Sequence, residues 1–421
     1  MTFVTSSAFP ATVHCLENGL TLVHQYMPAT PVVVADVWSK AGAVSEPAEW
    51  SGMAHFLEHM VFKGTEHLAP GMFDYAIETR GGLSNAATSH DYAHFYMTLA
   101  HEAFPEALPY LADLVLHAAI PADEFVRERQ VVLEEIRQAQ DDPDWIGLQA
   151  LSEQLFPSHA YGRPVLGTEA ILNERSPEEM RRFHQAHYQP HNMTVVVTGG
   201  MALEPTLEKV RHAFRAFPAP LDCPPSDVGQ IRPWWGVRHQ VLRVPRMEHA
   251  RLMMAWLGPG VEALDDACGM DILSALLAEG RSARLVRELR EERQWVLDIA
   301  SGFSLQRDCS LFTIQAWLDP QKVDAVEALI CERLATLTEQ PITAAELGRA
   351  KRLLINDFAF STETPGQLAG LYGYYSVVSS PEASYAYPRR IEAHTPQSLA
   401  RLAKTFLSTN AYAATVLLPT V

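Results

Sequence analysis

Residues 51–65 read SGMAHFLEHMVFKGT, and the rest of the chain is interpreted outward from this stretch. His55 and His59 are four residues apart, so on a helix they share one face with Cβ atoms roughly 5–6 Å apart. Two imidazoles placed in this way can bind one zinc ion. Glu58 is rotated by about a hundred degrees from His59 around the helix axis, so it can reach a water molecule without binding the ion. The spacing predicts metal-assisted hydrolysis, in which zinc acidifies water and a carboxylate takes its proton.

The alternative interpretation of this stretch is a polar helix face with two solvated histidines. The neighbouring residues argue against it, because the segment is otherwise apolar and ends at Gly64. Its apolar residues are Met53, Phe56, Leu57, Met60, Val61 and Phe62. Imidazoles and a carboxylate within such a helix need partners, because an unpaired buried charge is costly. We therefore favour the metal site.

A catalytic zinc site holds three protein ligands and keeps one position open, so a third ligand must come from elsewhere in the chain. The helix predicted at 121–138 has an apolar face centred on Phe125, Val132 and Ile136. The residues expected on its solvent side are Arg127, Gln130, Glu134 and Arg137, and those on the border are Glu124, Glu128, Val131 and Glu135. Glu135 therefore faces inward where Glu134 does not. Taken alone, this pattern is also that of an ordinary amphipathic helix with border carboxylates.

Three segments together resemble an inverzincin peptidase of the pitrilysin family, in the short subclass that includes the mitochondrial processing peptidase and bacterial paired-subunit peptidases. They are SGMAHFLEHMVFKGT at 51–65, GGLSNAATSHDYAHFY at 81–96 and ERQVVLEEI at 128–136. In that family the third ligand is a glutamate 76 residues after the second histidine, which is Glu135 here. A second glutamate seven residues earlier supports the site, and that position is Glu128. The resemblance thus implies His55, His59 and Glu135 as zinc ligands, with Glu58 and Glu128 as the catalytic carboxylates.

The same resemblance implies that peptides are cut inside an enclosed chamber. Asn85, Ala86 and Ala87 lie on a predicted edge strand, which would hold the substrate backbone by strand addition. A turn residue that follows Gly81 and Gly82 is a nearly equal alternative for Asn85.

The composition is that of a soluble globular protein, with 48% hydrophobic and 20% charged residues among 421. This length exceeds one ordinary core, so two or more domains are expected. The formal net charge of −17 disfavours nucleic acid as a partner, because phosphate binding needs clustered Lys and Arg. An acidic chamber would attract basic peptides, but solubility is the simpler explanation of the charge.

The chain begins MTFVTSSAFPATVH, which lacks the basic and apolar regions of a signal peptide. No run of 18 or more apolar residues predicts a membrane span or a membrane partner. Five widely scattered cysteines are expected to be free thiols in a reducing compartment, so we predict a cytoplasmic protein. Zinc is accordingly expected from histidines and not from sulfur.

The order of predicted elements indicates a duplication. The first half has strands at 18–27 and 31–42, the metal helix, a strand toward the end of 84–99, helices over 103–139, a capping-box start at Ser176 and a strand at 193–200. The second half has strands at 240–245 and 250–260, a helix at 266–279, a strand at 311–320, and helices near 321–337 and 343–359. Setting Gly269 on Gly52 places Ile272, Ala275 and Leu276 where the two histidines and Glu58 stand.

We therefore expect an α+β fold of two homologous domains, each a mostly antiparallel sheet with helices packed on one face. The expected boundaries are 1–217 for a zinc-binding domain, 218–233 for a linker rich in proline and polar residues, and 234–421 for a duplicated domain without a metal. The resemblance implies that the two domains form half of a clamshell.

The second half departs from the family at one position. Many homologues carry an arginine and, seven residues later, a tyrosine that holds the tetrahedral oxygen. Arg290 matches the arginine, but Leu297 stands at the tyrosine position. Leucine cannot donate a hydrogen bond to an oxyanion, a contact worth about 2.7–4 kcal/mol per donor. Without its tyrosine, Arg290 is better explained as a solvated helix charge.

An intact zinc half with an incomplete oxyanion half resembles the catalytic subunit of a heterodimeric peptidase. The expected partner is a homologous subunit that carries the Arg/Tyr pair, and a homodimer is the second choice. The rival from another class is a non-catalytic assembly or scaffold subunit, which in this fold loses the zinc residues. A peptidase dedicated to one precursor is a third possibility that the sequence does not separate from general peptide turnover.

Overall fold

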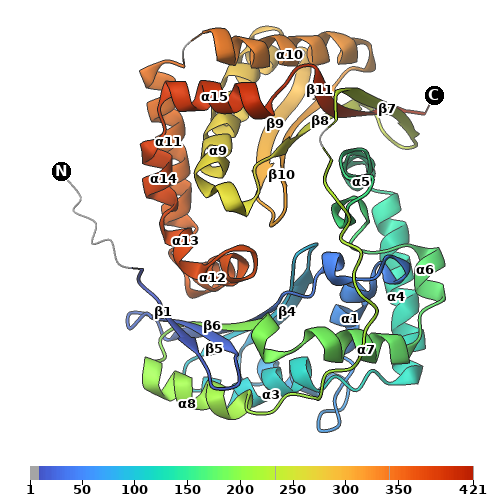
Figure 1. Ribbon diagram of the computed structural model, residues 1–421, viewed down its shortest axis with the longest axis vertical. Helices are drawn as coiled ribbons and strands as arrows, with labels where there is room; N and C mark the ends of the chain where they lie inside the picture. Colours follow the sequence, from blue (N-terminus) through green and yellow to red (C-terminus); the bar gives the residue numbers. More distant parts are fainter. Residues whose placement is uncertain (1–8, 233, 341, 421) are drawn as a thin grey trace. The chain divides into compact units, whose positions relative to one another are not determined.

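The computed structural model describes residues 9–232, 234–340 and 342–420, and these form two compact units (Figure 1). Unit 1 comprises Met1–Ile136, Pro164–Val228 and Ser361–Tyr385, and unit 2 comprises Arg137–Arg163, Gly229–Phe360 and Ala386–Val421. The units therefore do not follow the expected boundaries, which run in simple chain order. Residues Arg137–Arg163 from the first half of the chain belong to unit 2, and residues Ser361–Tyr385 from the second half belong to unit 1.

Unit 1 contains a six-stranded sheet in the order β1-β2-β6-β3-β5-β4. Its strands are β1 (Thr12–Cys15), β2 (Thr21–Tyr26), β3 (Val32–Ser39), β4 (Leu83–Thr88), β5 (Ala93–Ala100) and β6 (Met193–Gly199). Only β2 and β6 pair in parallel, so the sheet is mostly antiparallel as predicted. The stretch 84–99 is a hairpin of two strands, and β4 is left at the edge of the sheet.

Alternation of side chains along β5 explains which face of this sheet is the core. Phe95, Met97 and Leu99 are buried, and the residues between them are half-buried. The helices of unit 1 are α1 (Met53–Val61), α2 (Met72–Glu78), α3 (Phe104–Leu116), most of α4 (Ala122–Gln140), α6 (Glu169–Asn173), α7 (Pro177–His187), α8 (Leu203–Ala213), α12 (Pro365–Val378) and α13 (Pro381–Tyr385). The predicted apolar face of α4 is correct, because Phe125, Val132 and Ile136 all belong to the core.

Helix α12 lies on the opposite face of the same sheet, against β3 and β6. A Cβ atom at Gly373 would collide with the indole of Trp38, so glycine is required for this close approach. The Thr198 hydroxyl donates to the Pro365 carbonyl over 2.7 Å, which fixes the start of the helix on the sheet. The fold class predicted from the sequence is confirmed, with this helix as an addition on the second face.

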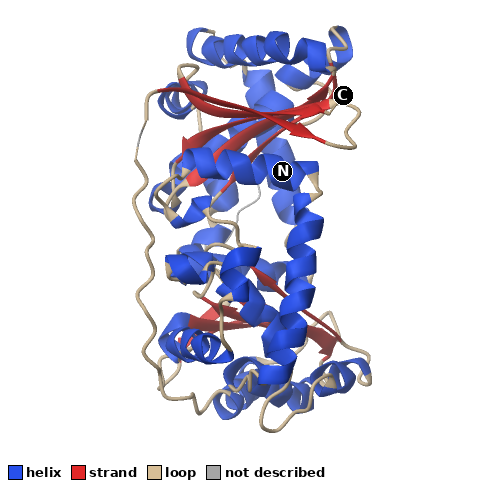
Figure 2. Ribbon diagram, turned by 90° about the vertical axis from the view of Figure 1, so that its right-hand side faces the viewer, coloured by secondary structure: helices blue, strands red, loops and turns tan. Residues whose placement is uncertain are grey.

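Unit 2 repeats the order of five of the six strands of unit 1, without a counterpart of β1. Its sheet runs β7-β11-β8-β10-β9, again with one parallel pair, β7 with β11. The strands are β7 (Gly236–Val244), β8 (Ala250–Gly258), β9 (Val296–Ser304), β10 (Ser310–Leu318) and β11 (Ala411–Pro419). The helices are α5 (Pro143–Leu155), α9 (Leu264–Ala278), α10 (Val323–Glu339), α11 (Ala344–Phe360), α14 (Tyr387–Ala393) and α15 (Pro396–Phe406). Figure 2 shows the two sheets in red, each with helices against it.

Helix α9 follows β8 in unit 2 as α1 follows β3 in unit 1. Ile272, Ala275 and Leu276 are buried in its core, where α1 carries the two histidines and Glu58. The duplicated helix therefore fills its interior with apolar side chains in place of a polar site.

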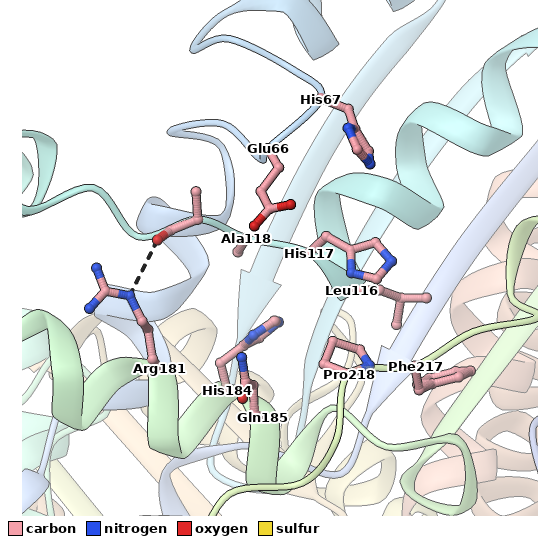
Figure 3. Close-up of a pocket in the computed structure, with 11 residues that line it drawn as sticks. Glu66, His67, Leu116, His117, Ala118, Arg181, His184, Gln185, Phe217 and Pro218 are labelled. Atoms are coloured by element: carbon pink, nitrogen blue, oxygen red, sulfur yellow. Dashed lines mark hydrogen bonds between the residues drawn. The ribbon is translucent and has the colours of Figure 1, made fainter.

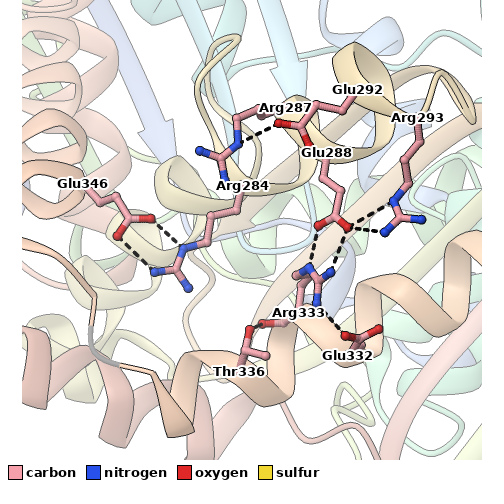
Figure 4. A network of polar contacts seen from close by, with 9 residues as sticks. All are labelled: Arg284, Arg287, Glu288, Glu292, Arg293, Glu332, Arg333, Thr336 and Glu346. Atoms are coloured by element: carbon pink, nitrogen blue, oxygen red, sulfur yellow. Dashed lines mark hydrogen bonds and ion pairs between the residues drawn. The ribbon is translucent and has the colours of Figure 1, made fainter.

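A network of ion pairs holds the π-helical turn Val286–Glu292, which leads into β9 (Figure 4). The Arg333 guanidinium on α10 donates to both carboxylate oxygens of Glu288, and Arg293 donates to the same carboxylate. The hydrogen bonds from Arg333 lower the pKa of Glu288 to about 2. Arg284 and Glu346 form a second pair that ties the preceding segment to α11.

Candidate metal centre and active site

The start of α1 is fixed by its backbone and by a buried carboxylate. Gly52 has φ +94°, and a Cβ there would lie 2.7 Å from the Cα of Gly167, so glycine is required by conformation and by space. The Glu46 carboxylate accepts hydrogen bonds from the backbone N–H groups of Gly52 (3.0 Å) and Ala54 (2.7 Å). It satisfies two donors that a helix start otherwise leaves unpaired. The capping-box pattern could not have predicted this role of Glu46. That pattern links residues three positions apart, whereas Glu46 precedes Ala54 by eight residues.

The structure brings the three predicted ligands together. The nitrogen and oxygen atoms that His55, His59 and Glu135 offer all lie within 4.8 Å of one another. Nε2 of His55 is 3.6 Å from Oε1 of Glu135, and Nε2 of His59 is 3.3 Å from its Oε2. Glu134, the neighbouring carboxylate, lies on the exposed side of α4. Within the described ranges this is the one group of three such side chains that could hold a metal ion.

The donor set fits zinc in chemistry and in spacing. Two imidazole nitrogens and one carboxylate oxygen are a known catalytic zinc set. Donors bonded tetrahedrally at about 2.0–2.1 Å sit about 3.4 Å apart, which is close to the two separations in this structure. Burial lowers the pKa of His55 to about 4, so its imidazole is neutral and has a lone pair to give. The hydrogen bond from His59 lowers the pKa of Glu135, so this carboxylate is ionised.

Glu128 is placed to orient one ligand. Its Oε1 lies 3.0 Å from Nδ1 of His59, and its Oε2 lies 2.7 Å from Nζ of Lys63. Burial acts to lower the pKa of His59, but the hydrogen bonds with Glu135 and Glu128 outweigh it and raise that pKa. With Nδ1 engaged by Glu128, the ring presents Nε2 to the other ligands. Lys63 was not predicted from the sequence, because nothing in the motif marks a lysine after the helix end as a partner of α4.

Glu58 stands beside the three ligands without joining them. Its Oε2 accepts a hydrogen bond of 2.6 Å from the Thr88 hydroxyl, at the end of β4. Burial raises the pKa of Glu58, partly offset by this hydrogen bond. A carboxylate with a raised pKa is a better proton acceptor near neutral pH. Thr88 is a further site residue that the sequence alone did not single out.

Comparison with known proteins agrees with this geometry. The family description "Insulinase (Peptidase family M16)" matches residues 21–169, and "Peptidase M16 inactive domain" matches residues 175–354. An uncharacterised zinc protease of Mycobacterium leprae is 30% identical over 91% of this chain and 84% of its own length. The chain belongs to peptidase family M16.

Other M16 relatives extend over similar lengths. The zinc protease PqqE of Helicobacter pylori is 29% identical over 93% of this chain and 89% of its own. An uncharacterised zinc protease of Streptomyces coelicolor is 29% identical over 85% of this chain and 78% of its own. The crystal structure of a protease from Helicobacter pylori superposes with a TM-score of 0.90 at 27% identity, covering 97% of this chain and 99% of that one. The family resemblance expected from the sequence is thus confirmed.

The predicted substrate-binding residues of this M16 chain lie on an edge strand. Asn85, Ala86 and Ala87 form the middle of β4, which pairs only with β5 in the described sheet. Asn85 and Ala87 are exposed, and Ala86 packs against the core. Asn85 is therefore a strand residue and not a turn residue, so the turn alternative is wrong.

Arg290 and Leu297 lie on two successive elements. Arg290 belongs to the π-helical turn Val286–Glu292, and Leu297 is the second residue of β9, with 58% of its surface exposed. The Arg290 guanidinium donates to Asp298 over 2.8 Å and to Glu291 over 3.1 Å. The Arg290 side chain is thus held in local ion pairs. These contacts agree with the interpretation of Arg290 as a charge on the helix surface.

A surface groove lies outside the predicted site. The groove has a volume of about 500 Å³ and runs between the end of α3 and α7, with Glu66, His67, His117 and Arg181 on its wall (Figure 3). None of its lining residues is a predicted site residue.

The five cysteines are free thiols, as predicted from the sequence. None of the described helices is both long and apolar enough to cross a membrane. The cytoplasmic location stays a prediction.

Proposed function

We propose that this chain is the catalytic subunit of a zinc-dependent endopeptidase that hydrolyses peptides. The convergence of His55, His59 and Glu135 within 4.8 Å, beside Glu58, carries the proposal. These three residues would hold the ion. When bound, zinc lowers the pKa of a water molecule to about 7 and polarises a carbonyl group.

Glu58 acts as the general base in this proposal. One of its carboxylate oxygens takes a proton from water as the water oxygen bonds to the scissile carbonyl carbon. The same proton then passes to the leaving amine nitrogen as the C–N bond breaks, which restores the carboxylate. The Thr88 hydroxyl fixes Oε2 and thereby the orientation of the group. Burial favours this role because it raises the pKa of Glu58.

Glu128 acts through His59 and is a positioning residue. Its hydrogen bond to Nδ1 favours the proton on that nitrogen and so leaves the Nε2 lone pair for the ion. Lys63 balances the charge of this buried carboxylate. The arrangement explains how the His59 ring is oriented with Nε2 toward Glu135.

The substrate backbone is proposed to add to β4 as a further strand. The outer side of an edge strand presents unpaired N–H and C=O groups, which an extended peptide can satisfy. Asn85, Ala86 and Ala87 supply this edge next to Thr88, which contacts the base. Hydrogen bonds along the backbone would place a peptide bond at the reacting centre.

A second subunit is proposed to supply what this chain lacks. Leu297 offers no hydrogen-bond donor, and Arg290 is engaged by Asp298 and Glu291. A homologous partner with an Arg/Tyr pair would stabilise the oxyanion, and a second copy of this chain is the next choice. The rival, a non-catalytic assembly subunit, has no need of three metal donors around a carboxylate base. The predicted absence of a nucleic-acid or membrane partner remains a prediction.

The test separates the base from the ligands. Glu58→Gln should retain about one zinc per chain and lose peptide hydrolysis, because Glu58 is the proposed base and not one of the three proposed ligands. Glu134→Gln, an exposed carboxylate on α4, is the matched control and should change neither. Elemental analysis and hydrolysis of a quenched fluorescent peptide measure both properties. Full hydrolysis by a zinc-loaded Glu58→Gln protein would contradict the proposed base.

A further inference from the structure

A buried carboxylate and an imidazole pair on the face of the unit 1 sheet away from the main core. Oδ1 of Asp36 on β3 lies 3.0 Å from Nδ1 of His94 on β5. Asp36 is 3% exposed, whereas its strand neighbours Ala35 and Val37 point into the core on the other face. A polar pair this deep in a sheet needs an explanation beyond packing, because apolar residues would stabilise the sheet as well.

The His94 ring is held rigidly. It stacks on Trp38 with ring centroids 4.1 Å apart and on Tyr96 with centroids 5.7 Å apart. Its side chain is 14% exposed. Nδ1 is engaged by Asp36, and no residue in the described part of the chain bonds Nε2. The pair therefore fixes one nitrogen and leaves the other available to a ligand.

The chemistry of the pair makes this nitrogen a donor. A lone buried carboxylate is costly, so the pair is most stable with no net charge. Two arrangements achieve this: ionised Asp36 with protonated His94, or neutral Asp36 donating to Nδ1 of neutral His94. Burial raises the pKa of Asp36, and the hydrogen bond with His94 opposes this rise. In both net-neutral arrangements Nε2 carries a proton, and a ligand that meets it must offer an acceptor.

The pair is close to the proposed reacting centre. His94 lies opposite Ala87 on the edge strand, one residue before the threonine that contacts Glu58. The charge of His94 also acts to lower the pKa of Glu58, so the two groups are within electrostatic reach. Ala87 and Asn85 are exposed on this face of β4. Helix α12 covers β3 and β6 of the same face, and its Tyr374 ring meets the ring of Tyr92, the residue before β5.

The spacing sets the length of the ligand. A peptide strand added to β4 would lie two strand spacings, about 9–10 Å, from the β5 backbone. Every second side chain of that strand would face the His94 side of the sheet. Ala87 has only a methyl group, so a long substrate side chain can pass over it toward Nε2. A short side chain would fall short of the ring.

We propose that Asp36 and His94 form a specificity subsite for a substrate side chain that ends in a carbonyl or carboxylate oxygen, as glutamine and glutamate do. The inference rests on the proposed peptidase function and on strand addition at β4. His94 donates the hydrogen bond from Nε2, Asp36 positions it, and Ala87 leaves the path open. Aliphatic side chains of equal length gain no hydrogen bond there.

Binding tests the subsite separately from hydrolysis. In a Glu58→Gln background, dissociation constants are measured by fluorescence anisotropy for octapeptides that carry glutamine, glutamate or norleucine at each position in turn. At one position, the glutamine and glutamate peptides should bind about 3–10-fold more tightly than the norleucine peptide, the effect of one net hydrogen bond. His94→Phe should bring that ratio to about 1, and His94→Gln, which keeps an N–H donor, should retain it in part. His101→Phe, the same change just beyond β5, is the control and should leave the ratio unchanged.

The outcomes are distinguishable. Zinc content and melting temperature establish that each variant is folded, and His94→Met replaces His94→Phe if the larger ring is not tolerated. An unchanged ratio in a folded, zinc-loaded His94 variant, or no preference in the parent protein, would overturn the subsite. If the wild-type chain hydrolyses peptides but shows no preference for glutamine or glutamate over norleucine, the proposed function stands and the subsite is wrong. A preference that depends on His94 in a chain that hydrolyses no peptide, even with a homologous Arg/Tyr subunit added, would remove the proposed function and leave the subsite.

Discussion

Replacing Glu128 by glutamine tests how the chain prepares its metal site. Glu128 contacts one of the proposed ligands through Oε1, which lies 3.0 Å from Nδ1 of His59, and its Oε2 lies 2.7 Å from Nζ of Lys63. An amide can still accept from Nδ1, but it loses the negative charge and can turn its amino group toward the Lys63 ammonium. The imidazole becomes a weaker base and its orientation is less well fixed. Loss of such a supporting partner typically lowers metal affinity by about 10–100-fold.

Competition with a chromophoric zinc chelator measures this loss directly. Glu124→Gln is the matched control, since Glu124 lies one helical turn earlier on α4 and pairs with Arg127. We expect Glu128→Gln to bind zinc about 10–100-fold more weakly than the wild type, and Glu124→Gln to bind it equally well. Equal affinities in wild type and Glu128→Gln would refute the reasoning that Glu128 prepares His59. A comparable loss in Glu124→Gln would show that the effect comes from helix stability.

The remaining predictions concern a ligand, the stability of unit 2 and the partner. Glu135→Gln should weaken zinc binding, whereas Glu134→Gln should not. If elemental analysis shows that Glu134→Gln loses more zinc than Glu135→Gln, the assignment of which side of α4 faces the site is wrong. Glu288 has a folded-state pKa of about 2 against an ordinary 4.5, so its ionised form stabilises the fold above about pH 5 and this contribution fades as the pH falls toward 2. The difference in free energy of unfolding between wild type and Glu288→Gln, from urea melts, should shrink over that range, and a pH-independent difference would count against the Arg333 contact. Because Leu297 provides no oxyanion donor, hydrolysis should rise by about 10²–10³ on mixing with a homologous Arg/Tyr subunit. Robust turnover by the purified chain, unchanged by any such subunit, would favour a homodimer with another donor.

The metal centre could be predicted because its signal is local and periodic. His55 and His59 share a helix face by their spacing alone, and the phase of α4 selects Glu135 over Glu134. The family resemblance agrees with this phase through the 76-residue spacing from His59. Alternation likewise predicted which residues of β5 enter the core.

Contacts between distant segments could not be predicted in the same way. Thr88 and Glu46 act through hydrogen bonds to α1, and no spacing rule links a strand end or a preceding loop to that helix. Asp36 and His94 read as ordinary strand residues until the register of β3 and β5 brings them together. Helices α5 and α12 carry short apolar faces that do not specify which sheet they cover, so the exchange between the two units was not foreseen.

The central claim is that His55, His59 and Glu135 bind one zinc ion. X-ray absorption at the zinc edge, combined with elemental analysis, tests it most directly. We expect about one zinc per chain, with two imidazole nitrogens at about 2.0–2.1 Å and carboxylate or water oxygens completing the shell. His59→Ala should lose most of the metal. Full zinc occupancy in His59→Ala, or a wild-type spectrum without two imidazole ligands, would contradict the account.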